Sequence, residues 1–365
     1  MRLWGEQFNR HGLLRRVGGL EQVAGVRLVT LGDGAERGVR VLEFRTGSGF
    51  EFDVIVDRAF DIGRCEINGK ALGWQSGVGY KGPWFAEQTD LGWLRTWGGG
   101  LLTTCGLDHA LFFAEDTAEQ YHYEPKAREG FGLHGRASNT PAKLTGYGHR
   151  WDGDTCVLCA EGEVLQASMF GEHLILRRRI EAVIGESKFT IHDEVENVGW
   201  DPTPHMLLYH INIGFPVVDE GAEIVVPTRS INPRGDYPAE GYRTLDAPEP
   251  AHFERVFEHD PIAESSGTVP VAIVNREREI GAYEVFNLNQ LPFHFVWRML
   301  GEGSYVVGIE PSTNRTGGRL DARERGELIV MEPGDVRSYD LELGALVGND
   351  EIDQFTRRVT ALGGV

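Results

Sequence analysis

Apolar and polar residues alternate with a period of two along most of the chain. In the segment 50–56, Phe50, Phe52, Val54 and Val56 fall on one face of an extended chain, and the segment 188–197 alternates in the same way. Successive side chains of a strand point to opposite faces, so this pattern predicts strands with one buried face. Further segments with this pattern are 25–31, 38–45, 163–170, 173–183, 222–227, 271–275, 293–300, 304–310, 327–331 and 338–346.

Helical periodicity is confined to two short segments, 4–14 and 353–362. Clusters of Gly, Pro, Asn and Asp separate the predicted strands, and the 48 glycines fit many tight turns. Strands and helices do not alternate as they would around a parallel sheet. The pattern therefore predicts an all-β protein, a large antiparallel β-sandwich with few short helices.

No internal repeat or linker divides the chain. The stretch 229–258 is rich in Pro, Gly and charge, and we interpret it as a long surface excursion. Although the length of 365 residues would allow two domains, all-β proteins often exceed the usual domain size. We therefore predict a single domain over residues 1–365.

The composition is that of an ordinary soluble globular protein, with 41% hydrophobic and 25% charged residues. The net charge of −19 disfavours nucleic-acid and membrane-surface partners, because their phosphate groups would be repelled. The N-terminus lacks a signal-peptide pattern, and no apolar stretch approaches the length of a membrane span. We expect a cytoplasmic protein.

The four cysteines do not indicate a disulfide framework or a zinc site. Cys156 and Cys159 form a CxxC, but within a predicted strand and without a second ligand pair. We interpret the cysteines as buried structural thiols. The glycines at 98–100 indicate a bulge or a close backbone approach, with Arg95 and Trp97 as neighbouring candidates for a site lining.

A first candidate for chemistry is His134 in the loop 130–142. Glycines on both sides suggest that a ligand or another chain segment approaches the histidine closely, and Arg136 follows it. The alternative is a histidine that is simply exposed to solvent.

A second candidate is the apolar segment 203–213, which contains two histidines and an asparagine. If 205–213 forms one strand, His210 and Asn212 share a face with Met206, and His205 lies on the other face. Two polar groups on one face would suit the floor of a cleft. The alternative is a buried histidine bonded to a backbone carbonyl.

A third candidate is Glu310 at the end of a hydrophobic strand. It shares a face with Gly308, which leaves room above that neighbour, and burial would raise its pKa toward the range of a general base. Pro311 is expected to end the strand. The alternative is a salt bridge at the rim to Arg315 or Arg319.

These three features, in this order on an all-β chain, resemble the aldose 1-epimerase (galactose mutarotase-like) superfamily, in a divergent branch. The resemblance extends from about residue 39 to residue 344. The segment GLHGR places His134 in the family's Leu-His-Gly loop, and Glu196-Asn197-Val198-Gly199 leads into the strand that carries His210. Glu310 in GIEP matches the catalytic glutamate, whereas Asn212 stands where the family usually has tyrosine.

The resemblance implies a β-supersandwich and a cofactor-free interconversion of the α and β anomers of a monosaccharide. Glu310 would take the proton from the C1 hydroxyl while His210 protonates the ring oxygen, and His134 would hold the sugar or share the acid role. No metal site is predicted. Candidates for substrate binding are Arg58, Trp74, Arg95, Arg136, His205, Asn212, Trp297 and Arg319; for each tryptophan, core packing is the alternative.

Two other functions remain open on the sequence. An isomerase or lyase acting on an oxidised or acidic sugar could use the arginines near the cleft. A non-catalytic carbohydrate-binding protein is the other, since fold does not fix function. A substrate screen separates the first alternative from a mutarotase, and binding that survives Glu310→Gln, with no anomer exchange by the wild type, would indicate the second.

Overall fold

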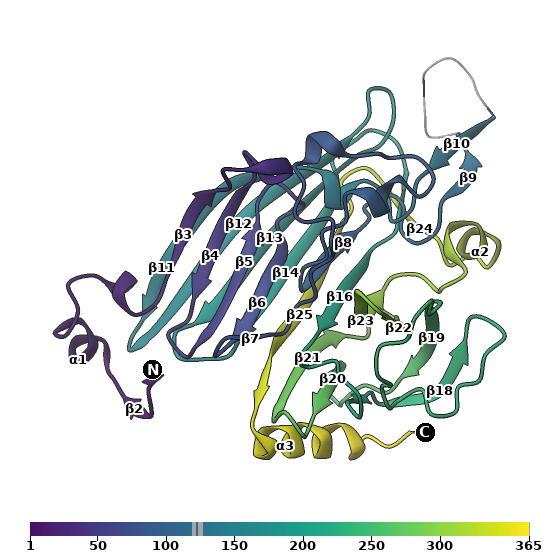
Figure 1. Ribbon diagram of the computed structural model, residues 1–365. Helices are drawn as coiled ribbons and strands as arrows, with labels where there is room; N and C mark the ends of the chain where they lie inside the picture. The colour runs from purple at the N-terminus through teal and green to yellow at the C-terminus, as the bar shows by residue number, and fades with distance from the viewer. Residues whose placement is uncertain (119–121, 123–126, 365) are drawn as a thin grey trace.

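The fold is built on two large antiparallel sheets, seen in a computed structural model that describes residues 1–118, 122 and 127–364 (Figure 1). Strands hold 47% of the residues. The eleven-stranded sheet has the order β18-β19-β22-β23-β16-β8-β6-β5-β4-β3, with β7 paired to β6. Its strands are β3 (Gly25–Thr30), β4 (Arg40–Arg45), β5 (Phe50–Ile55), β6 (Asp61–Ile67), β7 (Lys70–Ala71), β8 (Leu102–Cys105), β16 (Leu208–Gly214), β18 (Thr228–Pro233), β19 (Arg255–Pro261), β22 (Phe293–Gly301) and β23 (Ser304–Ser312).

The eight-stranded sheet has the order β11-β12-β13-β14-β25-β21-β20-β17. Its strands are β11 (Lys143–Asp152), β12 (Thr155–Ala167), β13 (His173–Val183), β14 (Lys188–Asn197), β17 (Glu223–Val225), β20 (Thr268–Asn275), β21 (Ile280–Asn287) and β25 (Val336–Val347). Three two-stranded sheets complete the β structure: β1 (Arg2–Leu3) with β2 (Glu6–Gln7), β9 (Ala114–Thr117) with β10 (Arg128–Phe131), and β15 (Thr203–His205) with β24 (Ile329–Met331).

The two large sheets pack face to face over an apolar core. Phe52 of the eleven-stranded sheet stacks at 4.5 Å between ring centroids on Phe189 of the eight-stranded sheet, and at the same distance on Phe44 beside it. Buried and less buried residues alternate along β13 and β14, as the period-two pattern predicts. The predicted antiparallel sandwich is confirmed. The single domain over 1–365 stays a prediction.

A buried ionic network also crosses the interface between the sheets. Arg178 on β13 pairs with Asp193 on β14 at 2.6 Å and with Asp61 on β6 at 2.9 Å. The hydroxyl of Tyr209, on β16, donates to Asp193 at 2.6 Å. Charges in a low-dielectric interior need such partners. The network ties β16, which carries His210, to the sheet behind it.

Three α-helices occur among the described residues: α1 (Arg10–Leu14), α2 (Gly318–Glu324) and α3 (Asn349–Thr360). Helix α1 falls within the predicted segment 4–14, and α3 overlaps the predicted segment 353–362 but begins four residues earlier, whereas α2 was not predicted. Helix α3 buries Ile352, Phe355 and Val359 against residues of the eight-stranded sheet. Within the described part of the chain, no helix has the length and apolarity needed to cross a membrane.

Three local predictions differ from the structure. The strand expected over 205–213 is two strands, because the amide of Leu207 donates to Oγ1 of Thr313 at 2.9 Å instead of continuing a ladder. Strand β23 continues through Pro311 to Ser312, where it still pairs with β16 and β22. The segment 229–258, predicted as a surface excursion, contains parts of β18 and β19 and buries Tyr242.

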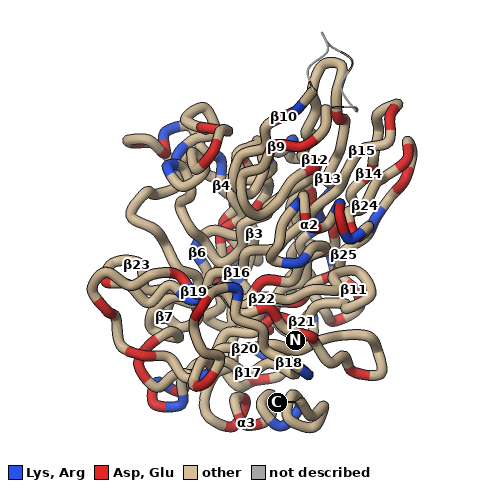
Figure 2. The backbone as a smooth tube through the Cα atoms, turned by 90° about the vertical axis from the view of Figure 1, so that its right-hand side faces the viewer, with Lys and Arg blue, Asp and Glu red and all other residues tan. Residues whose placement is uncertain are grey.

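The cysteines and the glycines at 98–100 lie largely where the sequence predicted. Cys65, Cys105 and Cys156 are buried free thiols, while Cys159 is half-buried. The glycines at 98–100 meet backbone closely: a Cβ on Gly100 would collide with the carbonyl of Ile62, and its φ of +100° favours glycine. Acidic residues, red in Figure 2, are spread over many loops and strands and produce the net charge of −19.

Candidate active site

The register of the eleven-stranded sheet brings His210 and Glu310 side by side. Strand β16 pairs with β23 so that Leu208 faces Ser312 and Ile211 faces Ile309. His210 and Glu310 are therefore opposite one another, and directly opposed residues point to the same side of a sheet. Their side chains lie on the outer face, away from the core that Tyr209 enters. Nε2 of His210 lies 3.3 Å from Oε1 of Glu310.

Gly308 makes the position of the Glu310 carboxyl group possible. The carboxyl leans back over Gly308, two residues earlier on the same face, so that a Cβ there would collide with Oε1. The space predicted above this glycine is thus filled by Glu310 itself. The rim salt bridges considered for Glu310 are absent from the described residues: Arg315 pairs with Glu258 and Glu327 instead.

Burial shifts the pKa values of the pair in opposite directions. It raises the pKa of Glu310 well above its usual range, an effect that Glu254 and Glu284 reinforce. Burial also lowers the pKa of His210 to about 4, although Asn212 opposes this shift. Both shifts disfavour charge in a site removed from water. The raised pKa of Glu310 and the lowered pKa of His210 therefore favour a pair that holds one titratable proton.

His134 lies beside the pair, on a loop that packs against β8. Its backbone is left-handed, with φ of +58°, and its amide donates to the carbonyl of Leu111 at 2.7 Å. The ring centroid is 5.5 Å from that of His210 and 4.6 Å from that of Trp93. Burial, with smaller effects from His210 and His109, lowers the pKa of His134 well below its usual value. His134 is thus neutral and able to donate or accept one hydrogen bond.

Three tryptophans surround the imidazole of His210. The ring centroids of Trp97 and Trp297 lie 5.0 and 5.3 Å from it, and that of Trp93 lies 6.5 Å away. Two of these indoles are fixed by hydrogen bonds to hydroxyls: Trp93 donates to Ser138 at 2.7 Å and Trp97 to Thr103 at 3.1 Å. Flat apolar walls of this kind suit the C–H faces of a sugar ring.

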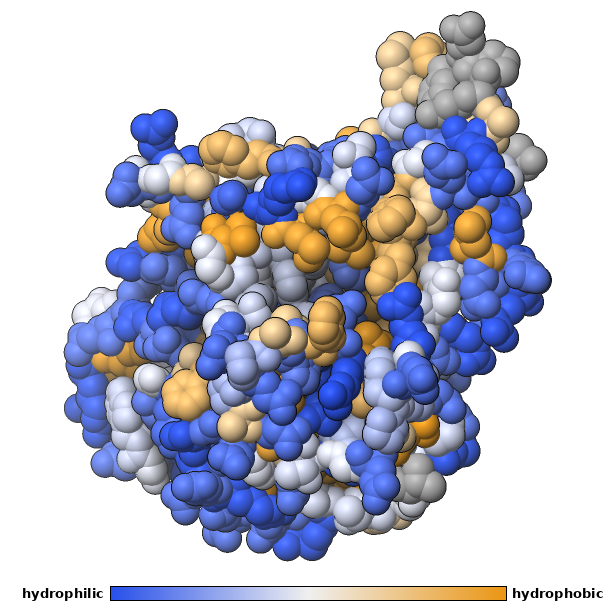
Figure 3. Space-filling view, turned by 45° about the vertical axis from the view of Figure 1, so that its right-hand side comes forward, coloured by the Kyte–Doolittle hydropathy of each residue, from blue (hydrophilic) through white to orange (hydrophobic). Residues whose placement is uncertain are grey.

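The pair opens into a cavity of about 310 Å³, at the lower end of the range for small-molecule sites. On the side of the molecule that carries β18, β19 and α2, Figure 3 shows hydrophobic residues in orange gathered around a hollow. The cavity is lined by Leu91, Trp93, Leu94, Trp97, Leu111, Phe112, Leu133, His134, His210, Arg234, Glu254, Val256, Phe295, Trp297, Glu310 and Thr316.

Four of the residues predicted from the sequence thus meet in one place: His134, His210, Glu310 and Trp297. Trp97, noted beside the glycines at 98–100, is also part of the lining. Trp297 lies in the middle of β22, and its indole N–H donates to Glu254 at 2.8 Å. Arg234 and Glu254 were not predicted, because the segment 229–258 that carries them shows no regular pattern of apolar and polar residues.

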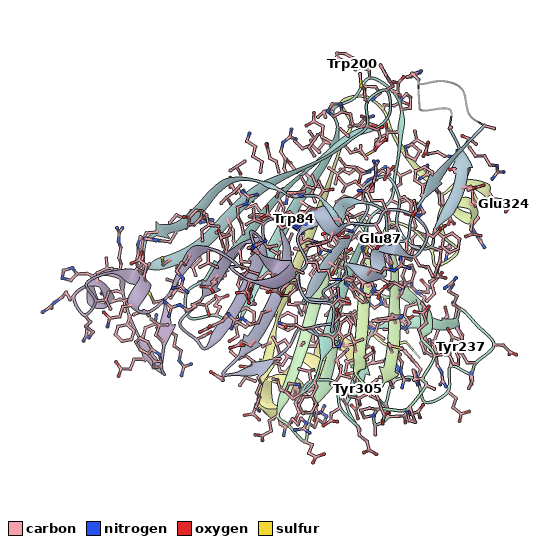
Figure 4. All side chains as sticks on the ribbon, turned by 45° about the horizontal axis from the view of Figure 1, so that its top comes forward. Trp84, Glu87, Trp200, Tyr237, Tyr305 and Glu324 are labelled. Atoms are coloured by element: carbon pink, nitrogen blue, oxygen red, sulfur yellow. The ribbon has the colours of Figure 1, made fainter. Side chains whose placement is uncertain are left out.

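Four predicted arginines do not line this cavity. Arg58 is buried and donates to the backbone carbonyls of Ser138, Lys81 and Thr96. Arg95 points to solvent and pairs at 2.6 Å with Glu87, labelled in Figure 4 on the segment between β7 and β8. Arg58 therefore connects three backbone segments near the site, whereas Arg95 forms an exposed ion pair.

The other two predicted arginines lie in a separate ionic cluster. Arg136 contacts Glu172 and Asp108, and Arg319 donates to Asp116 at 2.6 Å and to the carbonyl of Asp108 at 2.7 Å. Both side chains are thus held by groups that do not line the cavity.

The remaining three candidates also lie behind or beside the lining. His205 is fully buried, with Nδ1 2.8 Å from the carbonyl of Leu107 and Nε2 2.7 Å from the hydroxyl of Tyr339. The amide of Asn212 donates to the carbonyls of Gly100 and His210. Trp74 packs on Trp97 at 5.2 Å. Asn212 and Trp74 support cavity residues, whereas both nitrogens of His205 are already engaged.

Comparison with known proteins agrees with this fold. Residues 36–345 match the family described as Domain of unknown function (DUF4432). A solved structure from Klebsiella pneumoniae, provisionally described as an aldose 1-epimerase, is 25% identical with a TM-score of 0.85, over 94% of this chain and 91% of that one. No protein with a curated description matches the sequence.

Two more distant structures share the fold alone. A galactose mutarotase-like protein from Clostridium acetobutylicum is 11% identical, with a TM-score of 0.61 over 88% of this chain and 98% of that one. A galactose 1-epimerase from Lactobacillus acidophilus is 10% identical, with a TM-score of 0.55 over 88% of this chain and 99% of that one. The predicted galactose mutarotase-like fold is confirmed.

Proposed function

Because the chain belongs to the DUF4432 family and, by its fold, to a divergent branch of the galactose mutarotase-like superfamily, we propose that it is a sugar mutarotase. It would interconvert the α and β anomers of a monosaccharide by acid–base catalysis. The observation that carries the proposal is the contact of 3.3 Å between His210 and Glu310 on the floor of an aromatic cavity.

The reaction needs one base and one acid at neighbouring atoms of the sugar. Glu310 removes the proton of the C1 hydroxyl, and His210 delivers a proton to the ring oxygen. The C1–O5 bond then breaks to give the open-chain aldehyde. Rotation about the C1–C2 bond presents the other face of the carbonyl carbon, and ring closure returns both protons. Because the cycle begins and ends with one proton on the pair, no external acid or base is consumed.

The single proton of the pair suits these roles. The same proton count describes a protonated Glu310 beside a neutral His210, and a carboxylate beside an imidazolium. A sugar hydroxyl that donates to the carboxylate favours the second arrangement, because hydrogen bonding to a charged form stabilises it. His134, neutral and 5.5 Å from His210 between ring centroids, would bind a hydroxyl of the sugar.

The acidic-sugar alternative has one supporting group, Arg234. Its guanidinium lines the cavity, and no ion pair of Arg234 occurs among the described residues. It lies 3.6 Å over the ring of Phe112, exposed at the rim. A carboxylate or sulfonate on a sugar could pair with it, so the substrate screen includes uronic acids.

The test is anomer exchange measured by saturation-transfer NMR on a panel of neutral, deoxy and acidic aldoses. We expect acceleration by the wild type, and a loss of about 10²–10⁴-fold in Glu310→Gln and in His210→Ala, the usual contribution of an acid or base catalyst. Matched controls are Glu324→Gln, on the exposed end of α2 (Figure 4), and His149→Ala on β11; both should retain the wild-type rate.

Failure of the wild type to accelerate exchange of any sugar would refute the proposal. Sugar binding without turnover, retained in Glu310→Gln, would instead identify a carbohydrate-binding protein.

A further inference from the structure

The cavity offers few groups for the hydroxyls of a sugar, and this limits which sugars it can take. Ten of its sixteen lining residues are Leu, Trp, Phe or Val. Six are polar: His134, His210, Arg234, Glu254, Glu310 and Thr316. An ordinary aldose ring carries a hydroxyl on nearly every carbon, and each buried hydroxyl requires a partner.

The polar groups on the cavity floor are already assigned to the chemistry. Under the proposed function, on which this inference rests, Glu310 and His210 serve the C1 hydroxyl and the ring oxygen. His134 is then the remaining polar group beside them. Its neighbours are aromatic, with the ring of Trp93 at 4.6 Å. A sugar bound at C1 therefore meets mainly carbon on its other atoms.

The rim groups are partly engaged as well. The hydroxyl of Thr316 donates to Glu258 at 2.9 Å, and Glu254 accepts the indole N–H of Trp297. Arg234, which lies over Phe112 at the exposed rim, is the rim group least engaged by the protein. The arginines that could have reached hydroxyls from deeper positions, Arg58 and Arg319, are bonded to other protein groups.

From this shortage of partners we infer that the substrate is a deoxy sugar, an aldose that lacks at least one ring or side-chain hydroxyl. A C–H group placed against Trp97, Phe295 or Val256 gains from burial, whereas a hydroxyl there would lose its bonds to water. An apolar pocket rejects an added hydroxyl only moderately, by about 10²-fold. The preference should accordingly be about 10- to 100-fold in kcat/KM.

The experiment compares matched pairs of sugars: 2-deoxy-D-ribose with D-ribose, 2-deoxy-D-glucose with D-glucose, and 6-deoxy-D-galactose with D-galactose. Saturation-transfer NMR gives the catalysed rate of each, divided by its spontaneous rate. We expect one deoxy member to exceed its parent by about 10- to 100-fold. Parents that exchange as fast as all their deoxy partners would overturn the inference and leave the mutarotase proposal intact.

A variant tests the cause of the preference. Val256→Thr places a hydroxyl on the cavity wall while keeping a β-branched side chain on β19. The preference for the deoxy sugar should fall, by roughly tenfold. Val29→Thr on β3, also half-buried and away from the cavity, is the matched control and should keep the wild-type ratio. Equal ratios in Val256→Thr and the wild type would contradict the assignment of the preference to the apolar wall.

Binding separates the two proposals if the wild type exchanges neither these pairs nor any other sugar of the panel. Ligand-observed NMR with the same pairs would then show whether deoxy sugars bind more tightly than their parents. Tighter binding would support the ligand class although the mutarotase proposal had failed. Equal or weaker binding would overturn both.

Discussion

Glu310 depends on a residue that has no side chain. Its carboxyl group occupies the space over Gly308, and any Cβ at that position would push the carboxyl away from His210. Acid–base catalysis requires both groups within hydrogen-bond reach of the reacting atoms. The geometry of the pair is therefore set by the glycine as much as by the acid.

Gly308→Ala should lower kcat without unfolding the protein, because alanine is tolerated in a strand but displaces Oε1 of Glu310. We expect a loss of about 10²-fold in the rate of anomer exchange, the effect of a misplacement of about 1 Å. Gly146→Ala on β11 is the control, since a Cβ there meets no atom within 4 Å. A normal rate in Gly308→Ala would show that the carboxyl does not need its observed position.

The shared proton predicts a bell-shaped pH dependence of kcat/KM. Below about pH 4, His210 and Glu310 are both protonated and no base remains. As pH rises through the raised pKa of Glu310, the pair loses its proton and no acid remains. The rate should thus rise with pH near 4, pass a maximum and fall again at higher pH, with limits that belong to the pair as a whole. A rate independent of pH would contradict the shared-proton mechanism.

At the scale of elements, the site depends on how β16 is held against the eight-stranded sheet. Arg178 on β13 and Asp193 on β14 are both fully buried, and Tyr209 on β16 bonds to Asp193. The side chain that follows Tyr209 on the opposite face is His210. A change in this network should therefore affect folding first and the site through β16.

Asp193→Ala removes one of the two carboxylates that pair with the buried guanidinium of Arg178. We expect a loss of about 3–5 kcal/mol in the free energy of unfolding, measured by urea denaturation. Glu43→Ala, which breaks the exposed pair with Arg27, is the control and should cost no more than about 1 kcal/mol. Equal losses in the two variants would show that the buried network is not a major contribution to stability.

The pattern within each strand or loop also explains which strands and site residues the sequence could predict and which it could not. Period-two alternation predicted most strands, and His134, His210 and Glu310 each stood out because polar groups or flanking glycines interrupted a simple pattern. Arg319 did not reveal its role, since its partner Asp116 is 203 residues away. The sequence did not point to Arg234 and Glu254, because their positions depend on contacts between residues distant in the sequence. One such contact is the hydrogen bond from the hydroxyl of Tyr237, labelled in Figure 4, to the carbonyl of Val256 at 2.9 Å.

At the scale of the whole molecule, the two sheets have separate tasks. Figure 1 shows the strands of the two sheets. The eight-stranded sheet covers the core, and the eleven-stranded sheet carries the candidate site on its outer face. Strands β23 and β16, which hold Glu310 and His210, are neighbours near the middle of the larger sheet. Three strands (β22, β19 and β18) lie beyond β23, and five (β8, β6, β5, β4 and β3) lie beyond β16. This central position in the eleven-stranded sheet suits a site that must hold the side chains of His210 and Glu310 3.3 Å apart.

The cluster of Trp93, Trp97 and Trp297 gives the protein an optical property. Three of its eight tryptophans lie around the imidazole of His210 and face the cavity. Indole emission depends on the polarity and mobility of the surroundings, so a ligand that displaces water from the cavity would change it. The intrinsic fluorescence of the protein therefore reports occupancy of the site without an added dye, and without any reaction taking place.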